Sequence, residues 1–380
     1  MRRLAKAITV AAVLSATTVA WATETRVLTL GESNEIVKDE ANILLYPSVI
    51  PGYGGMVFGE VGSNALYRLG AQHDMGKTWG VVGLYLDRSP APVAGEIFRP
   101  PVDADGIDNR VNLFYGRSFG ESFDAGISFA FFRDYYKVYG DPTDKSERDD
   151  TAFNIALGLS WDERLDLALG VLTDSWTVKD EKGGDVYKPN TNWALNLRGR
   201  YRASVTDEVD LIPHAGFRYG AEAERQPEKA RKEATRIEYD AGLGVAISPV
   251  DAVLLLFDAG FNYHSDDQEY DPWTGKTVEM SLSQLVLPYL RVGLEGMVTD
   301  WLDLRLGAVK RWVDAFEDVT EEVSRRTGYS SMTTYLGAGL KFDRLTMDFM
   351  VDPGFFLRGP NFISGEAGML NARASLKYAW

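Results

Sequence analysis

Hydrophobic and polar residues alternate with a period of two along most of the chain. Residues 151–161 place every large apolar side chain on one face of an extended strand, with small and polar side chains on the other. Similar segments occur at 165–171, 193–202, 209–219, 237–245, 253–261, 302–306 and 345–351. Helical spacing would mix the two faces, so the pattern predicts strands.

The connections between these segments are alternately short and long. Short connections stand near residues 119, 162, 205, 248, 298 and 343. Long polar connections cover 88–107, 139–150, 179–189, 223–233, 266–280, 315–328 and 357–365. This alternation predicts fourteen strands from about residue 78 onward, and the segments 56–62 and 65–72 are candidates for two more.

These features predict an all-β fold, namely a transmembrane antiparallel β-barrel of about 14–16 strands with short periplasmic turns and long extracellular loops. A secreted β-sandwich or propeller also alternates, so alternation alone does not separate it from a barrel. The regular exchange of short and long connections favours the barrel. So does the lack of a shared sequence repeat of roughly 20–50 residues.

Both chain ends carry features of an exported protein. Residues 1–22 combine basic residues, an apolar run and Ala-Trp-Ala, the order of a secretory signal peptide cleaved after Ala22. A retained anchor would need about 20 apolar residues, and this run is shorter. At the other end, Leu376, Tyr378 and Trp380 share one strand face. This ending resembles the C-terminal signal that the barrel-assembly machinery reads in bacterial outer-membrane proteins.

We therefore expect a location in the outer membrane of a Gram-negative bacterium, surrounded by outer-membrane lipid and lipopolysaccharide. The formal net charge of -15 argues against nucleic-acid binding. The chain has no cysteine, which excludes disulfides and thiolate metal sites. Acidic loops at 140–150, 265–272 and 316–322 lack the EF-hand spacing, so we predict solvated loop tips, no metal site and no cofactor.

When the apolar faces are assigned to lipid, rows of charged side chains face the lumen. One row is a basic ladder of Arg198, Arg200 and Arg202. Neighbouring strands add Asp166, Asp174, Asp210, His214 and Arg218, and a second group contains Arg291, Glu295, Asp303, Arg305 and Arg311. In a water-filled pore such rows would set an ion preference. Alternatively, they are wall residues paired with one another.

The stretch "TRVLTLGESNEIVKDEANILLYPSVIPGYGGMVF" resembles the N-terminal region of fatty-acid-transporter (FadL-type) and PorV-like barrels, in which such a segment packs inside the barrel as a hatch. Where that family has Asn-Pro-Ala, this chain has Tyr46-Pro47-Ser48. Together with the signal peptide at 1–22, this resemblance implies a possible lumen plug at 23–52, followed by the barrel at 53–380. A disordered periplasmic tail is the alternative for the middle region.

Three functions are compatible with these features. The first is a porin-like channel that passes small solutes through a polar lumen. The second is a FadL-like transporter of hydrophobic compounds, and for it we assign Phe114, Leu254, Leu256, Leu285 and Leu287 to an inward apolar lining. The third is a non-transporting scaffold at the cell surface. We expect no enzymatic activity, because His214 and Asp210 stand about 13 Å apart along one strand. The pattern identifies neither the solute nor the oligomeric state.

Overall fold

The computed structural model describes residues 24–62, 66–89, 108–137, 147–179, 185–225, 231–270, 278–319, 324–351 and 372–380. The predicted signal peptide, residues 1–22, lies outside the described residues. So do the predicted connection 357–365, most of 88–107 and 139–150, and smaller parts of the other long connections and of the acidic loops.

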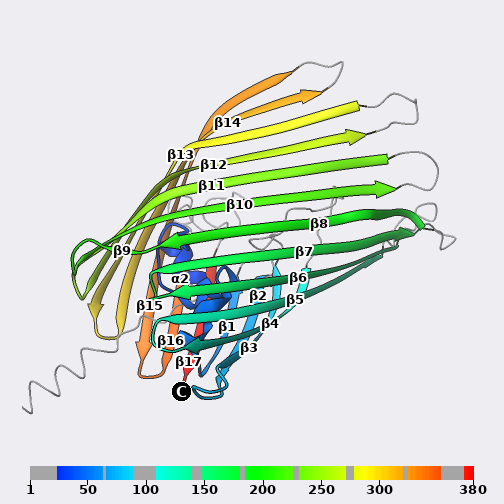
Figure 1. Ribbon diagram of the computed structural model, residues 1–380. Helices are drawn as coiled ribbons and strands as arrows, with labels where there is room; N and C mark the ends of the chain where they lie inside the picture. The colour runs from blue at the N-terminus through cyan, green and yellow to red at the C-terminus, as the bar shows by residue number, and fades with distance from the viewer. Residues whose placement is uncertain are drawn as a thin grey trace, which may run out of the picture.

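The described chain forms one closed antiparallel sheet (Figure 1). Each strand pairs with its neighbour in the chain, and β1 also pairs with β17, which closes the barrel. β8 and the two-residue β9 both pair with β10 and form a single wall strand, so the barrel has sixteen strands. The strands are β1 (Met56–Gly62), β2 (Leu66–Asp74), β3 (Val81–Ser89), β4 (Asp108–Phe119), β5 (Phe123–Lys137), β6 (Glu147–Trp161), β7 (Leu165–Lys179), β8 (Asp185–Tyr201), β9 (Ala203–Ser204), β10 (Val209–Arg225), β11 (Arg231–Val250), β12 (Val253–Tyr270), β13 (Val278–Thr299), β14 (Leu302–Val319), β15 (Arg325–Phe342), β16 (Leu345–Val351) and β17 (Ala372–Ala379).

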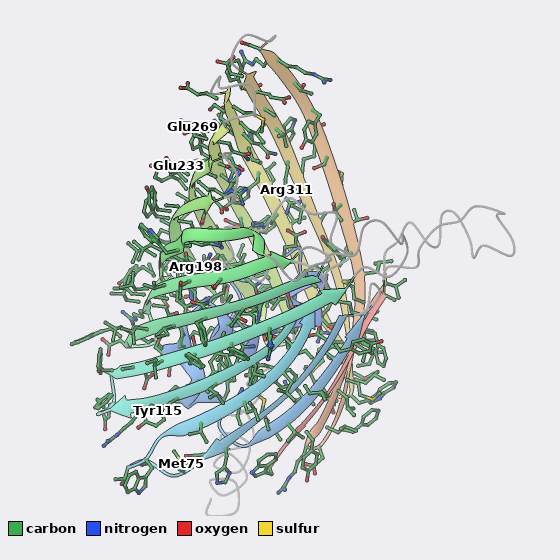
Figure 2. The ribbon with its side chains drawn as sticks, turned by 90° about the vertical axis from the view of Figure 1, so that its right-hand side faces the viewer. Met75, Tyr115, Arg198, Glu233, Glu269 and Arg311 are labelled. Atoms are coloured by element: carbon green, nitrogen blue, oxygen red, sulfur yellow. The ribbon has the colours of Figure 1, made fainter. Side chains whose placement is uncertain are left out.

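The predicted barrel is thus confirmed, with sixteen strands, the upper end of the predicted 14–16. The two upstream segments are β1 and β2, and the short connections fall where the sequence places them. Acidic residues make two of the tight reversals, β6–β7 and β15–β16, where Asp162, Glu163 and Asp343 all have φ near 52°. That left-handed conformation is tolerated best by Asn, Asp and Gly. Figure 2 places Met75 at the short-turn end of the barrel and Glu233 and Glu269 at the opposite end.

The two faces of the wall differ as the alternation predicts. On the outer face, Leu157, Leu167 and Leu304 are each about half exposed. Trp161 and Trp301 are exposed beside short turns, as expected of an aromatic girdle at a membrane interface. The inner face carries charged side chains that are almost fully buried. This combination is that of an outer-membrane barrel. Within the described residues, no helix is long and apolar enough to cross a bilayer.

One segment of the wall departs from strict alternation. Strand β13 shifts register between Val286 and Tyr289, because an extra residue is inserted in the pairing with β14. The shift reverses the phase, so Val286 faces inward and Leu287 is 57% exposed on the outside. Leu285 pairs with Tyr263, whose ring stacks on the exposed Tyr239. The inward assignment of Leu285 and Leu287 is therefore wrong.

Candidate functional site in the barrel lumen

Residues 24–55, hereafter the N-terminal segment, lie inside the ring of strands (Figure 1). They contain helix α2 (Glu24–Thr29) and the short 3-10 helices η1 (Glu40–Leu44) and η2 (Pro47–Tyr53). Asp39 caps η1 and forms a capping box with Asn42, while Pro47 opens η2. Local sequence therefore defines the turns of the segment, but its position is set by the wall.

Buried ion pairs hold α2 against strands β13–β16. The guanidinium of Arg26, 3% exposed, donates two hydrogen bonds of 2.7 Å to the carboxylate of Glu295 and one of 3.2 Å to Asp39. Arg305 also donates to Glu295, at 2.5 Å, and to Asp348, at 2.6 Å. Such charges are stable away from water only when they are paired, so the segment and the wall depend on each other here.

The basic ladder on β8 is occupied by the same segment. Arg198 donates to Glu35 at 2.6 Å. Arg200 donates to Asp166 at 2.8 Å and to the backbone carbonyl oxygen of Glu35 at 3.0 Å. Arg202 donates to Asp210 at 3.0 Å and to the carbonyl oxygen of Ile36 at 2.8 Å. The three arginines, two in β8 and Arg202 directly after it, therefore anchor the N-terminal segment to this part of the wall.

The remaining predicted lumen residues are paired in other ways. His214 and Arg291 both contact Asp258, at 3.0 and 3.1 Å. Arg218 donates a hydrogen bond to Glu238 at 2.9 Å, and Asp303 forms an ion pair with Lys341 at 2.7 Å. Arg311 pairs with Glu32 of the N-terminal segment. Asp174 lies in β7, and its side chain is outside the described part of the structure.

Apolar contacts complete the fit between segment and wall. Ile43 and Ile50 pack with Phe114, and Leu30 and Ile36 pack with Leu256. Leu254 lies beside that second cluster. Three of the five predicted apolar lining residues, Phe114, Leu254 and Leu256, thus face inward and contact these clusters.

Wall glycines bring the backbone of the segment against the backbone of the barrel. A β-carbon at Gly307 would lie 2.9 Å from the carbonyl carbon of Leu30, and one at Gly293 would lie 2.7 Å from the Leu30 oxygen. Gly126 and Gly158, which pair across β5 and β6, lie in the same way under Pro47 and Ser48. Real β-carbons do not tolerate such distances, so these positions select glycine.

Substituting Gly307 should therefore loosen the segment. Gly307→Ala places a methyl group against immovable backbone, and overpacking of this kind costs about 1–3 kcal/mol. We expect faster amide hydrogen exchange in residues 24–36, measured by mass spectrometry. The control is Gly170→Ala, because a β-carbon at this inward position would meet its nearest neighbour at an ordinary 3.6 Å. Equal protection in the two variants would contradict the close contact.

The N-terminal segment contacts all sixteen strands. Ion pairs and hydrogen bonds reach β2, β8, β13, β14, β15 and β17, apolar or glycine contacts reach β1, β3–β7 and β10–β12, and α2 lies against β16. One such contact is that of Lys377 with Glu40, at 2.9 Å, in which both side chains are buried. The segment therefore contacts the wall around the whole circumference of the barrel.

Two carboxylates of the segment have shifted pKa values of opposite sign. Burial would raise the pKa of Glu35, but Arg198, the Tyr46 hydroxyl and Arg200 together hold it below its ordinary value. Burial and the neighbouring Glu40 raise the pKa of Asp39 well above its ordinary value, and Arg26 offsets this only in part. Ionised Glu35 therefore favours docking of the segment, whereas ionised Asp39 opposes it.

The contribution of Glu35 to docking should disappear at acid pH. Docking lowers the pKa of Glu35, so the ionised group stabilises the docked state at pH values above the pKa of the released group, near 4.3. This stabilisation is lost as the pH falls through the lower pKa that Glu35 has when the segment is docked. We expect Glu35→Gln to speed amide exchange in residues 33–46 roughly tenfold at pH 7, as for a lost charge-assisted hydrogen bond. The difference from the unsubstituted protein should begin to shrink as the pH falls below about 4.3 and should go on shrinking at lower pH. A difference that does not change with pH would exclude this role.

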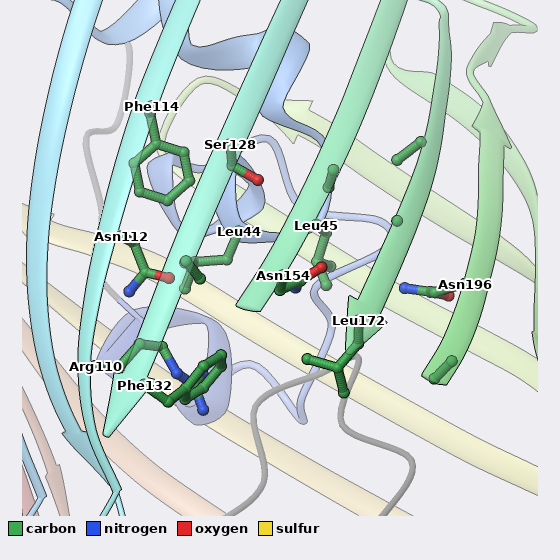
Figure 3. Close-up of a pocket in the computed structure, with 15 residues that line it drawn as sticks. Leu44, Leu45, Arg110, Asn112, Phe114, Ser128, Phe132, Asn154, Leu172 and Asn196 are labelled. Atoms are coloured by element: carbon green, nitrogen blue, oxygen red, sulfur yellow. The ribbon is translucent and has the colours of Figure 1, made fainter. Parts of the chain in front are cut away.

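A pocket lies between the N-terminal segment and the β4–β8 arc of the wall (Figure 3). Its empty volume is about 680 Å³, which includes space open to solvent. Leu44 and Leu45 of the segment line one side. The wall contributes apolar and small side chains together with several amide groups and one guanidinium. The principal wall residues are Phe114, Phe132, Leu172, Ala194, Asn112, Asn154, Asn196 and Arg110.

The geometry offers no support for catalysis by His214. Its Nε2 atom contacts Asp258 rather than Asp210, and its buried Nδ1 atom has no hydrogen-bond partner. Among the described contacts, no serine or threonine hydroxyl reaches the ring. The residues that sequence reasoning missed are those of the segment itself, Arg26, Glu35 and Asp39. In the sequence, the only feature that points to these residues is a run of isolated charges followed by an apolar stretch.

No family model and no curated protein matches the sequence. Solved structures with a similar architecture include the ferric yersiniabactin uptake receptor FyuA from Yersinia pestis, with 9% identity over 86% of this chain and 80% of that chain and a TM-score of 0.33. The FrpB iron transporter from Neisseria meningitidis has 9% identity, coverage of 86% and 82%, and a TM-score of 0.34. The alcaligin outer-membrane receptor FauA from Bordetella pertussis has 9% identity, coverage of 86% and 75%, and a TM-score of 0.39. TM-scores at this level carry no argument about ligand or mechanism.

Proposed function

We propose that this chain is a gated outer-membrane transporter of small solutes. Solutes enter the lumen from the long-loop side, bind in the pocket beside Leu44 and Leu45, and cross when the N-terminal segment leaves the wall. The observation that carries the proposal is the ring of contacts between that segment and all sixteen strands. A segment that contacts the wall on all sides would restrict free diffusion through the lumen, which favours a gated transporter over an open channel.

The position of the pocket supports a transport role over a purely structural one. The pocket is bounded on one side by the segment that must move and on the other by the fixed wall. Its lining combines apolar and hydrogen-bonding groups, as is usual for small-molecule sites. A ligand bound there touches the gate directly, so binding and opening are able to influence each other.

The test is the conductance of the refolded mature chain in a planar lipid bilayer. We expect a closed resting state with rare openings, and solute flux that rises when contacts of the segment are weakened. Steady large conductance in the unmodified protein would identify a simple porin. Absence of conductance even after the segment is released would identify a scaffold. Either result would overturn the proposal.

A further inference from the structure

A network of charged side chains joins the N-terminal segment to strands β13–β17. Ion pairs connect its members on the wall side, and Arg26 and Asp39 continue it into the segment. Nearly all of these side chains are buried. The network contains four cations and five carboxylates, namely Arg26, Arg305, Lys341 and Lys377 with Asp39, Glu40, Glu295, Asp303 and Asp348. With every carboxylate ionised, the network would carry one negative charge in excess, and an unbalanced charge away from water is costly.

Asp39 and Glu40 are the place where this excess is neutralised. These adjacent residues are 0% and 3% exposed, and their side chains form a hydrogen bond with each other. An ionised carboxylate only accepts hydrogen bonds, so a bond between two carboxyl groups requires a proton on one of them. One shared proton leaves the pair with a single negative charge, and the network is then balanced.

The groups around the pair leave room for one negative charge rather than two. Lys377 approaches Glu40 from β17 at 2.9 Å, and Arg26 approaches Asp39 from α2 at 3.2 Å. Arg26 gives two shorter hydrogen bonds, of 2.7 Å, to Glu295, so Asp39 shares this cation with a second carboxylate. The remaining titratable and charged groups that face the pair or its cations are Tyr53 of η2, Tyr85 of β3, Arg200 of β8, Arg305 of β14 and Asp348 of β16.

A bound metal ion does not account for the excess charge. A divalent ion would reverse the excess rather than cancel it, and such ions need several oxygen ligands arranged around them. Within the described residues, no group of three or more carboxylates or histidines is placed to hold one. Both oxygens of Asp39 already accept hydrogen bonds, from the backbone N–H of Ala41 and from Arg26. A proton needs only the pair itself.

We propose that the Asp39–Glu40 pair is a proton-binding site of the gate, so that the N-terminal segment holds one proton while it is docked and releases it when it leaves the wall. In water, the two carboxyl groups lose their buried surroundings and ionise with ordinary pKa values of about 4. Each opening of the gate is therefore linked to the movement of a proton. This assignment rests on the proposed transport function and adds its regulation.

Docking raises the pKa of Asp39, because burial and the neighbouring Glu40 disfavour its ionised form. The bound proton therefore stabilises the docked segment fully below about pH 3.9, and this stabilisation is lost as the pH rises through the higher pKa of the docked state. Glu35 has the opposite dependence, and its contribution is complete above about pH 4.3. Above that pH, a rising pH should open the gate.

The experiment is a pH series on the refolded mature chain in a planar lipid bilayer, with both compartments buffered alike. We expect the ratio of open to closed time to rise between about pH 5 and about pH 8, by up to about tenfold per pH unit for one released proton. A ratio that falls or stays constant over this range would overturn the proposal.

Glu40→Gln removes the shared proton and keeps the hydrogen bonds of the pair. The amide oxygen accepts from Lys377, and the amide NH₂ group donates to Asp39 in place of the proton. Four carboxylates then face four cations, so we expect the pH dependence to disappear. The matched control is Glu163→Gln, because this carboxylate also pairs with a lysine of the segment, Lys38, but is 80% exposed. Equal pH dependence in the two variants would contradict the assignment.

Amide hydrogen exchange separates failure of the proton site from failure of the transport function. Protection factors of residues 24–46, corrected for the intrinsic pH dependence of exchange, should fall as the pH rises in the unsubstituted protein but not in Glu40→Gln. This result without conductance at any pH would keep the proton site and remove the transporter. Gated conductance with protection that does not change with pH would keep the transporter and remove the proton site. If Glu40→Gln does not fold, Asp39→Asn tests the same hydrogen bond from its other side.

Discussion

Arg26→Met should release the N-terminal segment and turn the closed barrel into a conducting pore. The substitution leaves Asp39 buried without its guanidinium partner and removes both Arg26 hydrogen bonds to Glu295. Removing one member of a buried ion pair lowers the stability of the structure that holds it by about 3–5 kcal/mol. Because the barrel strands keep their own pairings, this cost falls on docking. We expect the open fraction in bilayer recordings to rise more than roughly a hundredfold.

The matched control is Lys38→Met. Lys38 is also a cation of the segment, and it pairs with Glu163, a carboxylate of the turn between β6 and β7, at 3.0 Å. Its side chain is 51% exposed and that of Glu163 is 80% exposed. An exposed pair contributes about 0–1 kcal/mol, so gating should barely change. Similar conductance in the two variants would indicate that the buried network does not hold the gate.

Cysteines at Ile36 and Gly244 should lock the segment to β11 and abolish flux until they are reduced. A β-carbon at Gly244 would lie 3.2 Å from the β-carbon of Ile36, just short of the usual 3.5–4.5 Å (about 3.8 Å on average) of a disulfide. The chain has no cysteine of its own, so the engineered pair has no competitor. In an Arg26→Met background, oxidation should close the pore and dithiothreitol should reopen it.

The single variants Ile36→Cys and Gly244→Cys serve as controls and should respond to neither reagent. The measurement is the open fraction before and after reduction in the same bilayer. Conductance that persists in the fully crosslinked protein would mean that solutes pass without movement of this part of the segment, and the gating proposal would then have to be abandoned.

The wall was predictable from sequence because a strand imposes its own periodicity. Alternation places Leu167 outside and Arg200 inside, and the structure agrees on both. Even the proximity of Arg200 to Asp166 and of Arg202 to Asp210 follows from neighbouring strands. Alternation fails where the register of β13 shifts, near Leu287. One inserted residue there exchanges the inward and outward positions along the rest of the strand.

The partners of the basic ladder were not predictable in the same way. Glu35 and Arg198 are 163 residues apart, and Arg26 and Glu295 are 269 apart. The N-terminal segment follows neither a strand period nor a long helix period, so no pattern orients its side chains. Its position depends on wall glycines such as Gly307, whose meaning appears only when the backbone that lies on them is known.

The seam between β1 and β17 has a consequence for how the molecule is assembled. The backbone N–H of Trp380 donates to the carbonyl oxygen of Gly55 at 2.9 Å, where the N-terminal segment ends and β1 begins. Leu376, Tyr378 and Trp380 face outward on that seam, each about half exposed. The outer edge of β1 and that of β17 therefore stay without a strand partner until these two strands pair with each other. Sealing the cylinder and enclosing the segment are consequently one event, so an incomplete chain yields neither a wall nor a gate.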